Sequence, residues 1–319
     1  MTKRQHKLVL MGGSPDEVRV KASTLKDVIE AMMEVARAAT RFYVDGVSQQ
    51  KGARPAWLDA ACDMDILGLA AGSLAIAMEA PPLREVDPVR FGDSCQMKLL
   101  DEAPVPPHPL GDFTVVDIVG QLMAEILANK DDEIVADGAV LDSCARLVRA
   151  ASRGYSGIQL HGVHGQSSPV VVRQEHIARI ERLRDATPPP QTVRVSGKLD
   201  SIVASRPDIR LLLADGTSVI CRVEDHDIER LRALWGTDVV VSGTAHFGPT
   251  RRLLRIEVKD LSEARPEDRL FQQVPKARTA SPVIDKRAAK GKRGVAGFFG
   301  TWPGDESEVE LVDALTELK

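Results

Sequence analysis

The chain has 319 residues and a mass of 34.7 kDa, more than the ~100 to 200 residues of an ordinary domain, so we expect more than one domain. Its 42 basic and 46 acidic residues leave a net charge of −4, which excludes a general polyanion binder but allows locally basic segments. The longest apolar stretch, residues 66–78, contains two glycines and a serine and is shorter than the ~18 residues of a membrane helix. The basic start also precedes too few apolar residues for a secretion signal.

Cysteine usage indicates a reducing compartment. Cys62, Cys95, Cys144 and Cys221 stand singly, without the paired spacing of a zinc site or a disulfide framework. We therefore expect reduced structural thiols in a cytoplasmic protein.

The first eighty residues predict a small α+β layer. Residues 7–10 and 17–20 alternate like strands around a cluster of turn formers, which predicts a hairpin. A capping-box-like pair, Thr24 and Asp27, precedes apolar residues at helical spacing, which predicts an amphipathic helix to about Tyr43. Two short apolar runs then predict two buried strands, at residues 64–69 and 74–78.

The next hundred residues predict mainly helices. Closely spaced prolines between residues 81 and 109 exclude a long helix there. Apolar periodicity and β-like runs then predict helices at residues 112–127, 135–151 and 174–184, and strands at residues 158–160 and 170–172. Three consecutive prolines, residues 188–190, predict a spacer between domains.

Beyond the spacer, alternating apolar residues predict a small barrel. The elements follow the order strand, strand, strand, helix, strand, strand, which resembles the OB-fold in topology. We expect eight residues to point inward: Val193, Val195, Leu211, Leu213, Val219, Val239, Val241 and Ile256. Trp235, between the helix and Gly236, is expected to cap the barrel core.

The last sixty residues differ from the rest. Residues 276–293 carry seven basic residues against one acid and little to bury, which predicts a disordered basic linker. Two phenylalanines and a tryptophan follow, and then aliphatic residues at helical spacing among acids, which predicts an amphipathic arm. The expected fold class is thus α+β, with an N-terminal α+β layer, a small five-stranded OB-like barrel and a flexible tail. The expected segments are an α+β domain (1–187), a proline spacer (188–191), an OB-like barrel (192–262), a basic linker (263–296) and an amphipathic C-terminal arm (297–319).

No catalytic signature stands out. A Walker loop, a dinucleotide-binding glycine motif and a lipase-type nucleophile elbow are all missing from the sequence. His161 and His164, with His176 further on, could hold a metal only if further ligands joined them. Asp238 and the pair Glu257 and Lys259 have the spacing of a metal-dependent nuclease, although an alternating barrel strand explains the latter pair better. We expect no cofactor, no metal and no enzymatic activity.

Nucleic-acid binding by the barrel is an alternative. OB-folds often bind single strands through a basic groove and stacked aromatic side chains. Residues 192–260 contain eleven basic and ten acidic residues, and their local basic cluster is Arg251, Arg252 and Arg255. These three arginines are the candidate nucleic-acid contacts.

The C-terminal arm carries the leading functional hypothesis. Residues 298–318, FFGTWPGDESEVELVDALTEL, resemble the toxin-neutralising tails of bacterial antitoxins, in which a Gly-x-Trp with acidic residues precedes an acidic amphipathic helix. Such antitoxins commonly partner PIN-domain ribonucleases, although they are usually far shorter and begin with a small DNA-binding domain. The resemblance implies a protein-binding arm. The expected contacts are Phe298, Phe299, Trp302, Leu311 and Leu315, with Lys292 and Arg293 as auxiliary contacts.

The sequence therefore predicts a non-enzymatic interaction protein, specifically an antitoxin that restrains a ribonuclease toxin. Two alternatives stay open: a single-stranded nucleic-acid-binding protein that uses the barrel, and a metal-dependent hydrolase. We expect a protein partner and no membrane.

Overall fold

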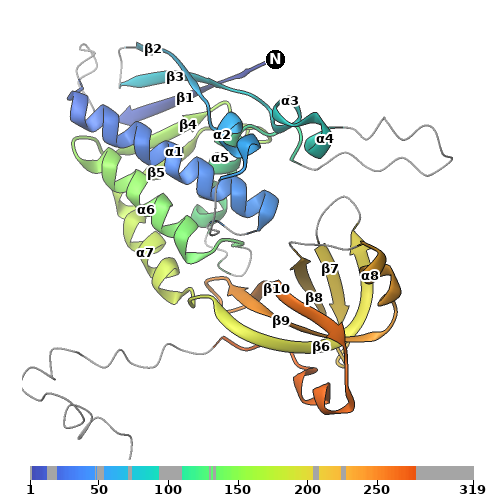
Figure 1. Ribbon diagram of the computed structural model, residues 1–319. Helices are drawn as coiled ribbons and strands as arrows, with labels where there is room; N and C mark the ends of the chain where they lie inside the picture. Colours follow the sequence, from blue (N-terminus) through green and yellow to red (C-terminus); the bar gives the residue numbers. More distant parts are fainter. Residues whose placement is uncertain are drawn as a thin grey trace, which may run out of the picture. The chain divides into compact units, whose positions relative to one another are not determined.

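A computed structural model defines two sets of secondary-structure elements (Figure 1), an α+β layer and a β-barrel. The structure describes residues 2–12, 20–46, 48, 54–70, 74–92, 110–128, 131, 134–203, 208–223 and 228–277. It confirms the predicted fold class over these residues; the C-terminal arm and most of the basic linker lie outside them.

The α+β layer contains a five-stranded antiparallel sheet with the strand order β2-β3-β1-β4-β5. Its strands are β1 (Arg4–Met11), β2 (Asp65–Ala70), β3 (Ala75–Ala80), β4 (Gly157–His161) and β5 (Val170–Arg173). Because β1 pairs with β3 on one side and β4 on the other, both of its edges are occupied over residues 7–9. The predicted hairpin between residues 7–10 and 17–20 is therefore wrong.

The main helices of this layer pack against one another and against the sheet, and Figure 1 shows α1, α6 and α7 side by side. The helices are α1 (Ala22–Asp45), α2 (Ala56–Ala61), α3 (Leu83–Val86), α4 (Pro88–Phe91), α5 (Val115–Leu127), α6 (Gly138–Ser152) and α7 (Ile177–Ala186), the last preceded by the 3₁₀ turn η3 (Gln174–His176). Each of the four longer predicted helices is present. The proline-rich stretch holds only the short α3 and α4 among its described residues.

Local capping explains two of the helix starts. Thr114 and Asp117 form a reciprocal capping box at the start of α5, and the Asp137 side chain accepts the backbone N–H of Val140 at the start of α6. The predicted capping box at Thr24 is wrong, since α1 begins at Ala22 after Lys21 without a side-chain cap.

The second strand differs from prediction in its burial. Residues 64–69 were expected to form a buried strand, and β2 does form there, but all six of its residues are exposed. Its neighbour β3 is largely buried, as predicted. The difference arises because β2 is an edge strand, so among the described strands only β3 flanks it.

The barrel closes in the order β10-β8-β7-β6-β9 and has OB-fold topology, with β10 and β8 parallel and all other neighbours antiparallel. Its elements are β6 (Gln191–Val203), β7 (Asp208–Leu212), β8 (Ser218–Val223), α8 (Ile228–Ala233), β9 (Asp238–Phe247) and β10 (Leu253–Glu263), followed by the 3₁₀ turn η4 (Pro266–Phe271). The eight predicted inward residues all belong to or pack against its apolar core. Trp235 does not cap that core; it is 65% exposed, and its indole N–H donates to the carbonyl of Asp200 at 2.9 Å.

The apolar interior consists of two clusters, one in the α+β layer and one in the barrel, within a compact unit spanning residues 1–277. Val274 and Ala277 still pack against the barrel cluster, so the folded body extends to Ala277. Within the described residues, no helix combines the length and apolar character needed to cross a membrane.

Candidate functional site

The residues predicted to bind a protein partner lie outside the described residues. They are Phe298, Phe299, Trp302, Leu311, Leu315, Lys292 and Arg293. Their role stays a prediction from the sequence.

The structure separates the three arginines predicted to contact nucleic acid. Arg251 and Arg252 are exposed in the turn between β9 and β10. Arg255 is only 6% exposed, and its Nη1 donates to the backbone carbonyl of Asp45. Arg251 and Arg252 thus remain accessible, whereas Arg255 is committed to a contact inside the body.

Four arginines surround Asp45, the last residue of α1. Its Oδ1 accepts from Arg90 and lies 3.1 Å from Nη2 of Arg222, and its Oδ2 lies 3.9 Å from Nε of Arg41. Its backbone carbonyl accepts from both Arg222 and Arg255. We call these five residues the Asp45 cluster.

Helix physics explains why arginines gather at this point. The last carbonyls of a helix lack partners within the helix and carry its negative dipole end, which cations stabilise. Gly46 follows with φ of 66°, the left-handed conformation common after helix ends, and a Cβ there would collide with Nη1 of Arg255. A bulge in β10 between Leu253 and Arg255 also lets consecutive residues contact the α+β layer, since Leu254 packs against the apolar cluster of that layer.

Burial gives Arg255 an unusual electrostatic environment. Burial and, next, the charge of Arg222 lower its pKa to about 10, against the attraction of Glu257, Asp208 and Asp137. The guanidinium therefore remains charged at neutral pH. Its Nε and Nη2 find no hydrogen-bond partner within the described part of the chain. The Asp45 cluster thus acts as a structural joint between the end of α1 and the barrel strands β8 and β10.

A buried Thr–His–Asp grouping lies at the start of α5. Thr114 Oγ1 is 3.0 Å from Nε2 of His6, and His6 Nδ1 is 3.9 Å from Oδ1 of Asp117. Asp117 also accepts from the Thr114 backbone at 2.9 Å, from the Thr114 hydroxyl at 3.0 Å and from the His164 backbone at 2.7 Å. Thr114 and Asp117 are 0% exposed, so the hydroxyl is closed to substrate, and the grouping serves to cap α5.

The three histidines considered as possible metal ligands have separate partners. His161 contacts the side chain of Gln159 at 3.2 Å, and His164 lies edge-on to Phe113 with its Nδ1 3.1 Å from Arg4. His176 accepts a backbone N–H 3.0 Å away. Across the described segments, no group of three or more histidine, cysteine or acidic side chains could hold a metal ion.

The nuclease-like residues are also apart. The His246 ring lies 3.3 Å from Glu257, whose neighbour across the sheet is Thr244. Asp238 instead accepts from the backbone N–H of Ala264, which directly follows β10 and is seven residues beyond Glu257, so roughly 20 Å away along an extended chain. Burial acts to raise the pKa of Glu257, but the hydrogen bond and charge of His246 and the nearby arginines outweigh it, so the net pKa is lowered. The two carboxylates cannot share a metal.

The three described cysteines are buried and free. Burial raises the pKa of Cys62 and of Cys221 to about 12 and raises that of Cys144 as well. Thiols with such pKa values are poor nucleophiles at neutral pH, which fits the predicted structural role.

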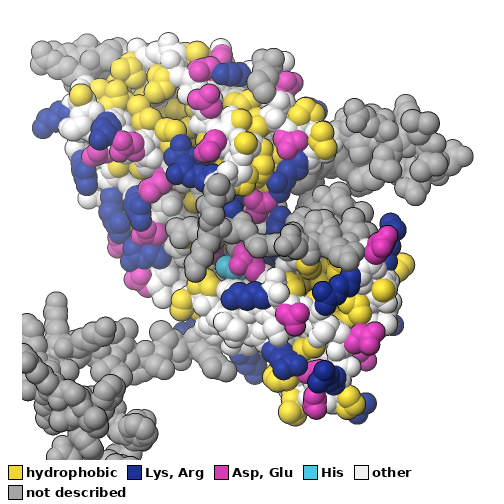
Figure 2. All heavy atoms as spheres, viewed as in Figure 1, with side chains coloured by type: hydrophobic (Ala, Val, Ile, Leu, Met, Phe, Trp, Pro, Cys, Tyr) yellow, Lys and Arg dark blue, Asp and Glu magenta, His cyan; other side chains and the backbone are white. Residues whose placement is uncertain are grey.

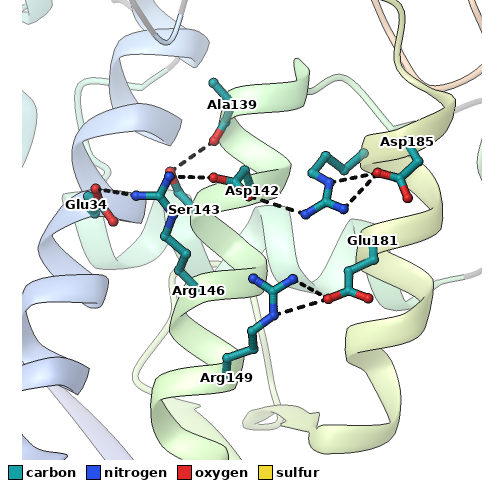
Figure 3. A network of polar contacts seen from close by, with 9 residues as sticks. Glu34, Ala139, Asp142, Ser143, Arg146, Arg149, Glu181 and Asp185 are labelled. Carbon is teal, nitrogen blue, oxygen red and sulfur yellow. Dashed lines mark hydrogen bonds and ion pairs between the residues drawn. The ribbon is translucent and has the colours of Figure 1, made fainter. Parts of the chain in front are cut away.

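A groove lined largely by charged side chains, of about 650 Å³, lies between α1 and α6. Arg146 spans it to Glu34 at 2.9 Å, and Arg153 spans it to Asp27 at 2.6 Å. Figure 3 shows how the pairing continues, since Asp142 also binds Arg146 and Glu181 of α7 binds Arg149. These ion pairs connect three helices, α1, α6 and α7, and their charges are already paired with one another.

Three exposed apolar residues follow one another closely on strand β2. Ile66 is 50% exposed, Leu67 51% and Leu69 41%. Beside them runs an apolar groove lined by Leu8, Ile29, Met32, Met33, Met64, Ile66, Ile76 and Met78. Figure 2 shows hydrophobic side chains gathered where β2 and β3 meet α1. Sequence reasoning missed this surface, because a run of apolar residues reads equally as a buried strand.

Comparisons with protein-family models, with curated proteins and with solved structures found no match for this chain.

Proposed function

We propose that this chain is a non-enzymatic cytoplasmic interaction protein that binds a protein partner through its C-terminal arm, residues 297–319. The observation that carries the proposal is the composition of the arm, which places two phenylalanines, a tryptophan and regularly spaced aliphatic residues after a body that extends to Ala277. Aromatic side chains of this kind commonly dominate the energy of an interface.

We further propose that the partner is a PIN-domain ribonuclease toxin and that the chain acts as its antitoxin. The support is the resemblance of residues 298–318 to antitoxin tails. Lys292 and Arg293 precede the aromatic residues, and a guanidinium or ammonium group can occupy a cluster of carboxylates in place of a metal ion.

The polar groups described in the body have structural roles. Thr114, His6 and Asp117 cap a helix, the histidines have separate partners, and the arginines of the Asp45 cluster join two parts of the fold. These groups have structural tasks that require no substrate.

Truncation and point substitution test the proposal. We expect a chain ending at Ala277 to keep its melting temperature but to lose capture of the ribonuclease encoded by the neighbouring gene, together with relief of its toxicity. Trp302→Ala should weaken binding about thirtyfold, roughly 2 kcal/mol, as for a typical interface anchor.

The matched control is Trp235→Ala, which removes an exposed tryptophan from the barrel and should leave affinity unchanged. Equal affinities of the Trp302→Ala and Trp235→Ala variants would contradict the role of Trp302 as an anchor. A large drop in melting temperature on truncation would show that the arm stabilises the body.

Single-strand nucleic-acid binding is the second candidate function. It is favoured by the OB topology and by exposed Arg251 and Arg252 in the β9–β10 turn, since OB-folds bind oligonucleotides partly through this loop. Fluorescence anisotropy with a labelled single-stranded oligonucleotide should then show salt-dependent binding that weakens in Arg251→Ala and Arg252→Ala. If both variants bind the oligonucleotide as tightly as the wild type, the β9–β10 turn is excluded as the contact.

A further inference from the structure

Strand β2 forms one edge of the sheet. Among the described residues it pairs only with β3, and it carries no charge from Ile66 to Ala70. The opposite edge is different, because β5 is only four residues long, buries Val170 and Val172 and ends in Arg173. Proteins commonly blunt an exposed edge with charge or shortness, and β2 has neither apart from Asp65 at its start.

The helix-side surface next to this edge is apolar and adaptable. Ile66 lies opposite Met78 and Leu69 opposite Ile76, so both exposed side chains face the same side as the buried residues under α1. Methionines contribute to the groove beside them, and methionine side chains adapt well to a partner surface. A partner strand would therefore find both backbone groups and an apolar layer to join.

A bulge in β2 selects one register for pairing with a copy of itself. The bulge falls between Ile66 and Gly68, so Leu67 and Gly68 together oppose Ala77 and share the face away from the helices. An antiparallel pair centred between Leu67 and Gly68 matches every face: Ile66 meets Leu69, Leu67 meets Gly68 and Asp65 meets Ala70. A shift of one or two residues would put at least one helix-side residue opposite one on the other face.

The contacts in this register are also favourable. Ile66 and Leu69 form apolar cross-strand pairs with their counterparts, and Leu67 covers Gly68, beside which a Cβ would find open space. Asp65 meets an alanine rather than another acid, and Lys3 already pairs with it.

We propose that β2 is a homodimer interface, in which the β2 strands of two copies pair antiparallel about a two-fold axis between Leu67 and Gly68. The pairing joins two sheets into one and brings the apolar groove of each copy beside that of the other. The inference is independent of the C-terminal arm.

The size of the surface sets the strength of the dimer. Six residues of strand and a narrow groove cover less than the ~800 Å² per partner of a stable complex, so we expect a Kd on the order of 10 µM.

Sedimentation of the full chain over a concentration series tests the proposal. The wild type should pass from monomer to dimer, and Ile66→Lys and Leu69→Glu should each raise the dimer Kd at least tenfold. An equimolar mixture of the two variants should recover dimer, because in the proposed register the lysine introduced in one copy meets the glutamate introduced in the other. The control is Leu270→Lys, which places the same charge at an exposed leucine outside the sheet and should dimerise like the wild type.

Circular dichroism would establish that each variant is folded. Three results would overturn the proposal: a wild type still monomeric at about 100 µM, roughly ten times the expected Kd; a dimer that survives both substitutions; or a mixture that fails to recover. If the wild type remains monomeric, hydrogen exchange of the β2 amides would show whether the edge is free. Protection of these amides in a monomer would mean that the chain itself covers β2.

Discussion

Arg255 shows how the surroundings of a side chain determine its role. On the sequence it belongs with Arg251 and Arg252 as a basic cluster, and on an alternating strand it points out of the barrel. In the structure that outward side is covered by the end of α1, and the guanidinium caps the carbonyl of Asp45. Arg252 and Arg255 are only three positions apart along the chain, yet Arg252 is exposed and Arg255 is buried.

Replacing Arg255 should destabilise the body. We expect Arg255→Met to lower the free energy of unfolding by about 2 kcal/mol, because it removes a charged donor from a helix end. Urea denaturation measures the change. Arg252→Met, at an exposed position of the adjacent turn, should alter stability by less than about 0.5 kcal/mol. Similar effects of the two substitutions would contradict the joint that we assign to Arg255.

His6 should make stability depend on pH. Burial lowers the pKa of His6 below its usual 6.5, against the attraction of Asp117, and Arg4 lowers it further. The unfolded chain therefore binds a proton more readily, so stability is fully present above about pH 6.5 and falls as the pH decreases through the lowered pKa.

We expect His6→Gln to flatten this part of the profile in thermal melts between pH 7.5 and pH 5. His161→Gln, which alters a half-buried histidine outside the buried grouping, should keep the wild-type slope. An unchanged slope in His6→Gln would place the pH dependence elsewhere.

The end of helix α1 depends on Gly46, a residue without a side chain. Gly46→Ala should destabilise the protein by more than the roughly 1 kcal/mol that a left-handed conformation costs an alanine, because the new Cβ would also displace Arg255. Gly216→Ala is the matched comparison, since Gly216 has φ of 81° with open space around its missing Cβ. Urea denaturation of both variants isolates the contact, and equal losses would show that Arg255 moves aside freely.

Periodicity predicted most elements because burial determines most of this fold. The helices α1, α5 and α6 each bury one apolar stripe, and the barrel strands alternate as their core requires. The errors occurred where the position of a strand depends on which other strand it pairs with. Residues 7–10 alternate equally well for any neighbour, and their actual partners lie some seventy and one hundred and fifty residues away.

The Asp45 cluster could not be predicted for a related reason. Asp45 lies 177 residues from Arg222 and 210 from Arg255, and no spacing signals such a contact. The one indication in the sequence was Gly46, because a glycine often follows the end of a helix. The carbonyls at such an end lack partners within the helix and are stabilised by a nearby cation.

Proteolysis should begin beyond the end of the folded body at Ala277. We expect trypsin to cut first among the basic residues between 278 and 293, where composition predicts disorder. Cleavage near the prolines at 188–190 should be slower, because Arg222, Leu254 and Arg255 hold the barrel to the α+β layer. Mass spectrometry of the early fragments would measure the order, and a first cut at the prolines would contradict it.

The joint at Asp45 also limits what dissection of this protein can reveal. A fragment carrying only the barrel would uncover Arg222 and Arg255, whose partner on α1 would be gone. Two newly accessible guanidinium groups beside Arg251 and Arg252 would form an artificial basic patch, and phosphate backbones bind such patches without regard to sequence. Retention of that fragment on DNA or RNA would then report where the chain was cut, so only a chain that keeps α1 can answer whether the barrel binds nucleic acid.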